Sequence, residues 1–367
     1  MKISLPLNDF YCMSLKYFFV TIFIGNLFLF SHAQKYSNEF LQIGIGGRSL
    51  SMGNAVVASS SDIASGYWNP SGLLSLNNNL TLGLMHSSFF GGLAKYDYGA
   101  VAIKNSDSSA FGLSIIRFGV DDIPNTLDLV DANGNFDFSK LKSFSIADYA
   151  LLVSYARKVR QLPNIDVGGN LKIIRRIVGE FASAWGFGFD FSARYSFRAF
   201  AFGATLRDAT STFNAWSYNT ETFEEAFIKT GNELPKNGLE ITMPRLILGT
   251  AYEKIINEKF FVLGEINADV TFDGKRNTLL KFSIISIDPH VGIEVSYLKR
   301  FYLRSGVYNI QNILAINGKK VLNLQPSIGA GIKYKNFNLD YAFTDIGNTS
   351  VALYSHVISI SFGLDRK

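Results

Sequence analysis

The stretch W-G-F-G-F-D-F-S-A-R-Y-S, residues 185–196, decides the fold of this chain. Its odd positions hold Trp, Phe, Phe, Phe, Ala and Tyr, whereas its even positions hold Gly, Gly, Asp, Ser, Arg and Ser. A period of two indicates a β-strand, because successive side chains leave opposite faces of the backbone. One face is almost wholly aromatic, and the rest of the chain repeats the pattern with too few helices to cover such faces. We therefore expect the aromatic face to contact lipid.

The length of this strand fits a membrane. Trp185 to Tyr195 gives roughly 23 Å of membrane depth at ~3.3 Å per residue and ~45° tilt. That depth matches the apolar band of an outer-membrane barrel. No stretch after residue 33 holds 18 consecutive apolar residues, which excludes transmembrane helices. The sequence thus predicts an all-β fold, a transmembrane antiparallel β-barrel in the cell outer membrane.

The first 33 residues have the features of a cleaved signal peptide. Lys2 and Lys16 precede an apolar run, residues 17–30, and residues 31–33 read S-H-A, a small-x-small cleavage site. The run is too short to span a membrane as a helix. Cleavage would remove Cys12, the only cysteine, and so exclude disulfides, thiolate metal sites and a cysteine nucleophile. The net charge of +5 is spread evenly, which argues against a nucleic-acid partner.

After residue 79 the alternation predicts 14 strands, with 12 or 16 as the other even counts. They lie near 80–87, 95–104, 109–118, 147–157, 165–178, 184–196, 198–207, 244–254, 260–270, 288–298, 301–308, 322–334, 337–344 and 354–364. Loops after odd strands, such as 119–146 and 208–243, are long, and those after even strands are short. A barrel with both termini in the periplasm has short periplasmic turns and long outer loops.

Two of the long loops carry local motifs. Thr222 and Glu225 form a capping-box pattern and Gly231 follows, which predicts a short helix over 223–230. Residues 131–135 read D-A-N-G-N, like the start of a calcium loop, but Phe136 and Lys142 replace the turn glycine and the bidentate glutamate. We therefore interpret 131–135 as a polar turn and expect no metal and no cofactor.

Residues 34–78 precede the first strand, and 79–367 form the predicted barrel. The stretch 40–74 is rich in Gly, Ala and Ser and lacks lipid-facing alternation. Its glycines allow tight turns in a confined space, so we expect a plug inside the lumen, which would otherwise be an open channel. Arg48 and Asp62 would pair with lumen residues such as Asp190, Arg194 or Glu265. Trp68-Asn69-Pro70 would end the plug and lead directly into the first strand.

The same segment resembles the PorV/PorQ family of outer-membrane proteins, itself similar to the FadL-type long-chain fatty-acid transporter barrels. The matching positions are Phe40, Leu41, Ile43, Gly44, Gly46, Arg48, Leu50, Met52, Gly53, Ala55, Ala58, Tyr67, Trp68, Asn69, Pro70, Gly72 and Leu73. The resemblance implies a 14-stranded barrel with an N-terminal plug. It also implies type IX secretion components or secreted cargo domains as partners, besides outer-membrane lipid. The C-terminus lacks the terminal aromatic residue common in barrels.

Catalytic chemistry finds little support. His86 and Ser88 share a strand face, as a surface lipid hydrolase requires, but no third group that would orient the histidine is evident from the sequence. We interpret His86 as an interfacial residue and expect no enzyme.

Polar residues predicted to face the lumen are the better functional candidates, although a polar interior that merely holds the plug is the simpler interpretation. They are Asp166, Lys172, Arg176, Asp190, Arg194, Glu265 and Asp269. Together with the resemblance, they lead us to expect a non-enzymatic barrel of the type IX protein secretion system, acting as translocon partner or cargo shuttle. The alternative is a FadL-like carrier of hydrophobic small molecules, with a lateral opening, an apolar lumen pocket and a hydrophobic ligand.

Overall fold

The computed structural model describes residues 37–127, 129–130, 134–314, 318–344 and 354–365. The predicted signal peptide and residues 131–133 of the calcium-like loop lie outside these ranges. Among the described residues, none of the helices is long and apolar enough to cross a membrane.

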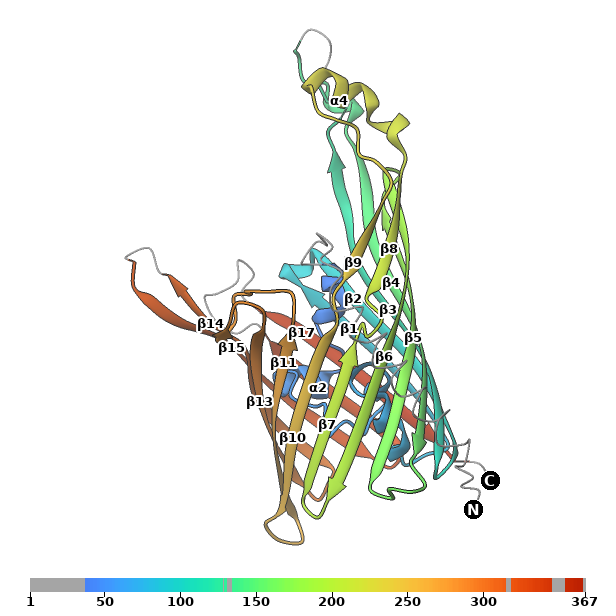
Figure 1. Ribbon diagram of the computed structural model, residues 1–367, viewed down its shortest axis with the longest axis vertical. Coiled ribbons are helices and arrows are strands. Elements are labelled where there is room, and N and C mark those ends of the chain that lie inside the picture. Colours follow the sequence, from blue (N-terminus) through green and yellow to red (C-terminus); the bar gives the residue numbers. More distant parts are fainter. Residues whose placement is uncertain (1–36, 128, 131–133, 315–317, 345–353, 366–367) are drawn as a thin grey trace, which may run out of the picture. The chain divides into compact units, whose positions relative to one another are not determined.

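Fourteen antiparallel strands pair into a closed ring (Figure 1). The ring runs from β1 through β7 to β10, β11 and β13, and then through β14 to β17, which pairs with β1. The strands are β1 Leu80–Phe89, β2 Ala94–Ser106, β3 Ser109–Asn125, β4 Lys142–Lys158, β5 Ile165–Val178, β6 Ala182–Phe197, β7 Phe200–Arg207, β10 Arg245–Ile255, β11 Phe260–Thr271, β13 Ser286–Tyr297, β14 Phe301–Leu314, β15 Lys320–Tyr334, β16 Phe337–Thr344 and β17 Ser355–Leu364. The predicted fold class and the count of fourteen are confirmed.

The two ends of the ring differ in their connections. Turns 107–108, 159–164, 198–199, 256–259, 298–300 and 335–336 all lie at one end, which we call the short-turn end. The other end, the long-loop end, carries the long connections after β3, β7 and β11 that the sequence predicts. The connections after β1 and β5 are short, and the predicted long loop 309–321 is wrong, because β14 extends to Leu314 and β15 begins at Lys320. The prediction that all connections at one end of the barrel are short is therefore confirmed.

Short elements extend the long-loop end beyond the ring. Strands β8 (Thr212–Tyr218) and β9 (Gly238–Thr242) continue the sheet beside β6, and β12 (Leu280–Lys281) pairs with β13. Helix α4 (Glu224–Thr230) ends at Gly231 as predicted, with φ 69°. The predicted capping box is wrong, because Phe223 is the N-cap and makes no side-chain cap. The Thr222 hydroxyl instead donates to the Asn219 carbonyl.

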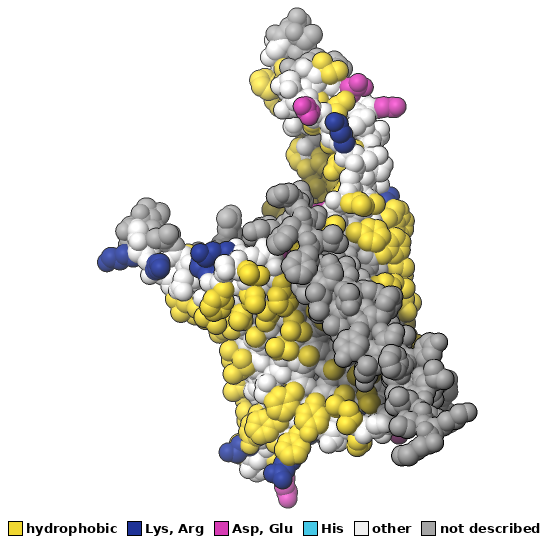
Figure 2. Space-filling view, in the orientation of Figure 1, with side chains coloured by type: hydrophobic (Ala, Val, Ile, Leu, Met, Phe, Trp, Pro, Cys, Tyr) yellow, Lys and Arg dark blue, Asp and Glu magenta, His cyan; other side chains and the backbone are white. Residues whose placement is uncertain are grey.

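The outward face of the ring is apolar, as the alternation predicts. Trp185, Phe187, Phe189 and Phe191 on β6 are all exposed, with Phe189 at 43%. Leu339 on β16 is also exposed, at 37%, so no other described element covers either face. Figure 2 shows the hydrophobic side chains spread over the wall, with charged side chains near its ends. This arrangement suits a wall surrounded by acyl chains.

One ladder of the ring is incomplete. Strands β13 and β14 pair only from Val291–Val307 to Tyr297–Phe301. Beyond that point β13 contains Pro289, which has no N–H to donate, and β14 turns at Asn309, with φ 51°. The last residues of β14 therefore pair only with β15, and the two strands lean away from the wall as a hairpin (Figure 1).

The N-terminal segment, residues 37–76, lies inside the ring. Its elements are the 3-10 helix η1 (Glu39–Gln42), helices α2 (Gly47–Ser51) and α3 (Ser65–Trp68), and the 3-10 helix η2 (Pro70–Ser75). Most of its side chains are buried, including Ile45, Met52 and Leu73, none of which is exposed at all. Helix α2 contacts β14 to β17, and η2 contacts β2 to β6. The segment thus touches opposite sides of the wall.

Candidate functional site

The site is built where the N-terminal segment meets the inward face of the wall. Glycines on the wall let the two backbones touch. A Cβ on Gly306 would lie 2.5 Å from the carbonyl oxygen of Met52 and closer still to the amide nitrogen of Gly53. Gly292 approaches Met52, Gly203 approaches Val57 and Gly168 approaches Ser71 in the same way. Only glycine permits such close approach, so these positions are shaped for the segment.

Glycines of the segment itself turn its backbone, as expected. Gly44, Gly46 and Gly53 have φ of 101°, 93° and 61°, in the region that glycine adopts most easily. The amide of Gly53 donates to Ser327 Oγ at 3.1 Å, and its carbonyl oxygen lies 2.9 Å from His290 Nδ1. The tight turn after Met52 is therefore held by side chains of β13 and β15.

Arg48 does not pair with the partners expected from the sequence. Its Nε donates to Glu294 on β13 at 3.1 Å, and its Nη1 lies 3.8 Å from Asp62 within the segment. The expected partners Asp190, Arg194 and Glu265 lie on β6 and β11, whereas the carboxylate that holds Arg48 lies on β13. The predicted pairing of Arg48 was wrong because alternation along a strand shows only that a charge points into the barrel. It does not show which side of the segment faces that charge.

The carboxylate that holds Arg48 belongs to a larger charged group. Glu294 also accepts from Arg304 Nε on β14 at 2.5 Å, and Arg304 Nη1 donates to Asp340 on β16 at 2.7 Å. Four charges of alternating sign thus join helix α2 to three strands. Arg48, Glu294 and Arg304 each have two ionic partners, which offsets the cost of removing these charges from water.

Glu265 fastens the segment to β11. Its two carboxylate oxygens accept from the amides of Ala58 at 2.7 Å and Ser59 at 3.0 Å. The side chain is almost completely buried, at 1% exposure. Hydrogen bonds to a charged acceptor are the strong kind, and both amides would lose their partner without it.

Arg194 on β6 makes a second connection between wall and segment. Its guanidinium donates to the Ser60 carbonyl oxygen at 3.0 Å and to the Ser75 hydroxyl, and it pairs with Asp166 on β5 at 3.0 Å. Asp166 thus acts on the segment only through Arg194.

The remaining predicted lumen charges mostly join strand to strand. Lys172 is buried and pairs with Asp190 at 2.8 Å and with Asp208. Arg176 pairs with Asp148 at 2.9 Å and with Glu240 at 3.3 Å, and Asp269 lies 3.3 Å from Arg245. All seven predicted lumen residues face inward, but they form separate pairs around the ring rather than one cluster.

The Trp-Asn-Pro motif holds the segment together. Trp68 Nε1 donates to the Ile45 carbonyl oxygen at 2.8 Å, and Asn69 Nδ2 donates to that of Val57 at 2.8 Å. Asn69 also caps η2, whose first residue is Pro70. The predicted direct entry into the first strand was therefore wrong, since η2 continues to Ser75 and β1 begins at Leu80.

Besides the seven predicted lumen residues, the inward side chains of Arg207 and Asn170 bind the segment, and reasoning from the sequence missed the first of them. Arg207 on β7 lies over the Tyr67 ring, 4.1 Å from its centre, and donates to the Tyr67 carbonyl oxygen at 3.1 Å. Asn170 on β5 donates to the Gly66 carbonyl oxygen at 2.9 Å. Both residues stand at positions that the alternation along their strands directs inward, and this alternation was the one sign of them in the sequence.

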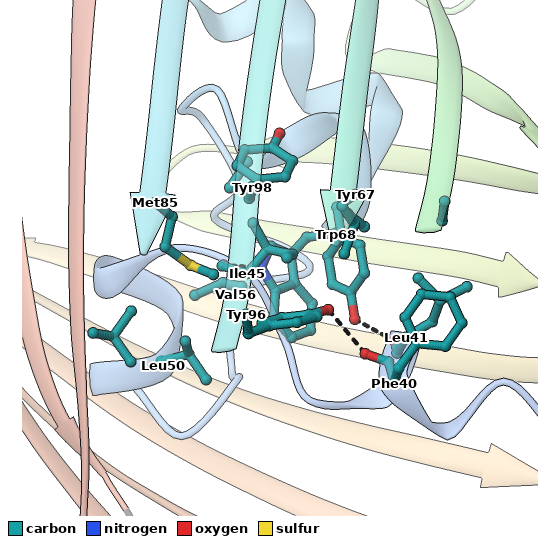
Figure 3. Packing of buried hydrophobic residues seen from close by; sticks show 14 of the residues in the cluster. Phe40, Leu41, Ile45, Leu50, Val56, Tyr67, Trp68, Met85, Tyr96 and Tyr98 are labelled. Carbon is teal, nitrogen blue, oxygen red and sulfur yellow. Dashed lines mark hydrogen bonds between the residues drawn. The ribbon is translucent and has the colours of Figure 1, made fainter. Parts of the chain in front are cut away.

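Much of the interior is apolar (Figure 3). Segment residues Phe40, Ile45 and Trp68 pack with Met85 on β1 and Tyr96 on β2, in a cluster that also includes Ile116, Leu152 and Ile174 on β3 to β5. This cluster, which we call the apolar interior, is filled by the segment rather than empty. Two cavities among the described residues, of about 30 Å³ and 470 Å³, have many polar side chains in their walls.

The candidate hydrolase residues lie on the outward face. His86 Nδ1 is 2.7 Å from Asp97 Oδ1, which supplies an orienting group that the sequence did not reveal. Within the described part of the chain, however, no hydrogen bond joins Ser88 to His86. The described residues also contain no group of three or more His, Cys, Asp or Glu placed to hold a metal ion.

No known protein family and no curated protein matches the sequence. Several solved structures share the fold. The CymD monoaromatic hydrocarbon channel has a TM-score of 0.55 and 13% identity, over 88% of this chain and 98% of that chain. The toluene transporter TodX of Pseudomonas putida has a TM-score of 0.53 and 14% identity, over 88% and 98%. The Ralstonia pickettii toluene transporter TbuX has a TM-score of 0.51 and 13% identity, over 88% and 98%.

These neighbours are FadL-family outer-membrane barrels, and they are channels and transporters rather than enzymes. At such low identity they establish the fold alone. None of them points to the PorV/PorQ family or to type IX secretion, so that expectation stays a prediction.

Proposed function

We propose that this chain is an outer-membrane barrel that admits hydrophobic small molecules. Of the two functions expected from the sequence, this is the alternative, and it now has the better support. The structural neighbours are channels or transporters for toluene and other monoaromatic hydrocarbons. We place the barrel in the membrane with its short-turn end in the periplasm and its long-loop end facing the outside of the cell, as is usual for outer-membrane barrels.

The apolar interior is the observation that carries the proposal. A porin for polar solutes has a polar, water-filled lumen. Here aromatic and aliphatic side chains of β1 to β5 face apolar residues of the segment instead. A hydrophobic solute can cover this wall in place of the segment, so that the apolar side chains of the wall stay out of water.

The segment would act as a movable plug on this route. Its charged contacts at Glu265, Glu294 and Arg194 are made with β11, β13 and β6 rather than with β1 to β5. Among the described residues no ion pair joins the segment to β1 to β4, although several hydrogen bonds do. The Tyr96 hydroxyl donates to the Phe40 carbonyl oxygen at 2.9 Å, the Tyr98 hydroxyl to that of Ile63 at 3.0 Å, and the Gly46 amide to Met85 Sδ at 3.0 Å. Moving the segment away from this side breaks these hydrogen bonds but separates no ion pair. In this proposal residues 34–78 are the plug, and residues 1–33 are removed on export.

The test is uptake of radiolabelled toluene by a Gram-negative host that lacks a hydrocarbon transporter. Cells that produce this chain should take up dilute toluene several-fold faster than cells with an empty vector. Uptake of sucrose, the polar control, should not change. Faster uptake of both solutes would indicate an open pore, and faster uptake of neither would contradict the proposal.

Type IX secretion is the second candidate, and the motif over residues 40–73 is the observation that favours it. Deleting the gene in the native organism separates the two functions. The secretion hypothesis expects cargo proteins to disappear from the cell surface and medium. Unchanged export together with slower toluene uptake would leave only the first function.

A further inference from the structure

The charge is not spread evenly as the sequence suggested, because the short-turn end of the barrel is strongly basic. The six turns, with two residues on either side of each, hold ten Lys or Arg and three Asp or Glu. Figure 2 shows Lys and Arg side chains at this end, below the apolar part of the wall. Such an excess of one sign attracts anions over a distance of about a Debye length, ~8 Å at physiological ionic strength.

The 470 Å³ cavity opens at this basic end. Its wall includes Arg198 from the turn after β6, and Lys333 and Lys335 from the turn between β15 and β16. Lys333 faces inward, because its neighbours Ile332 and Tyr334 are exposed on the outer wall. We call these three cations the mouth cations. All three contribute to the cavity wall, and Arg198 and Lys335 also contact the outward-facing rings of Phe197 and Tyr334.

The mouth cations have no acidic partner among the described residues. Arg198 lies over the Phe197 ring at 5.2 Å and Lys335 over the Tyr334 ring at 5.5 Å, and these contacts leave their charges uncompensated. Cations deeper in the cavity differ, since Arg48 and Arg304 are bound to Glu294. An arriving anion would therefore meet free charge at the mouth and compensated charge further in.

The cavity wall also offers apolar surface. Ile63 and Leu76 of the segment and Leu263 of β11 contribute to it. The segment lies beyond the cavity and prevents deeper entry. A chain with carboxylate side chains and a few apolar ones fits this combination, because its charges can stay at the mouth while its apolar groups enter.

We propose that the mouth is a docking site for an acidic segment of a soluble periplasmic protein, which would receive or deliver the solute there. The proposal rests on the orientation given under the proposed function. Attraction between opposite charges would bring the partner to the barrel quickly, and salt would weaken the complex.

The experiment measures binding of a fluorescein-labelled octaglutamate peptide to the full-length barrel in phosphatidylcholine nanodiscs. The mouth variant carries Arg198→Gln, Lys333→Gln and Lys335→Gln. The control variant carries Arg157→Gln, Lys158→Gln and Arg160→Gln, which remove three charges from a turn outside the cavity wall. We expect the mouth variant to bind at least about tenfold more weakly than wild type, because it lacks three uncompensated charges that attract the peptide. The control should bind like wild type.

Equal weakening in both variants would mean that diffuse rim charge, of the kind that also attracts anionic membranes, is responsible, and it would overturn the proposal. Binding that is unchanged in the mouth variant would overturn it too. Toluene uptake has a different probe and readout, so its failure would contradict the transport function without touching the docking result.

Discussion

Replacing Gly306 with alanine should release the N-terminal segment from the wall. The added Cβ would overlap the backbone of Met52 and Gly53, and backbone atoms cannot move aside as a flexible side chain can. A shift of the segment there would also lengthen the 3.1 Å hydrogen bond between the Gly53 amide and Ser327. We expect a cost of about 2–4 kcal/mol to the docked state.

Trypsin cleavage after Arg48 reports this release, because Arg48 is buried against Glu294 in the docked state. A cost of ~2 kcal/mol raises the open population about 30-fold, and cleavage should accelerate accordingly. The matched control is Gly264→Ala on β11, where a new Cβ would meet nothing within 4 Å. Cleavage at the same slow rate in both variants would show that the segment is not packed against β14.

A disulfide between the segment and β1 should stop transport reversibly. Ile63 lies in the segment, and its Cβ is 3.2 Å from an ideal Cβ on Gly83. That distance is close to the 3.5–4.5 Å typical of disulfides. In the double variant Ile63→Cys/Gly83→Cys, oxidation should reduce toluene uptake at least about tenfold, because a tethered segment cannot leave the lumen. Dithiothreitol should restore uptake.

The control for this tether is Gly112→Cys/Ser154→Cys. These residues face each other on β3 and β4, and their Cβ atoms would be 3.3 Å apart. Their disulfide joins wall to wall. It crowds Leu73 and removes the hydrogen bond from Ser154 to the Gly66 carbonyl oxygen, but it does not tether the segment, so uptake should not fall. Full uptake by the oxidised 63–83 variant would mean that solutes pass without movement of the segment, and the proposed route would be wrong.

The wall could be predicted almost completely from the sequence. Alternation in stretches such as 165–178 reflects a physical constraint, since each lipid-facing position must be apolar. Beyond the membrane that constraint ends, and this explains why β8 and β9 and the extensions of β3 and β4 were not predicted. Their side chains contact water or each other, so polar and apolar residues can stand on either face of these strands.

The contacts inside the barrel were harder to predict. Parity placed Glu265 and Arg194 in the lumen correctly, but it could not pair Arg48 with Glu294, some 246 positions away in the sequence. Wall glycines such as Gly306 also looked like ordinary small inward residues. Their role becomes visible only once the path of the segment through the ring is known.

The account depends most on the apolar face of the wall touching lipid while the segment stays inside. Two single-tryptophan variants, with the other tryptophans replaced by phenylalanine, test this in bilayers that contain brominated phospholipid. Trp185 is 52% exposed on the outer wall, and Trp68 is 4% exposed within the segment. We predict strong quenching of the Trp185 fluorescence and little quenching of Trp68. Equal quenching of both, or protection of Trp185, would contradict the barrel as described.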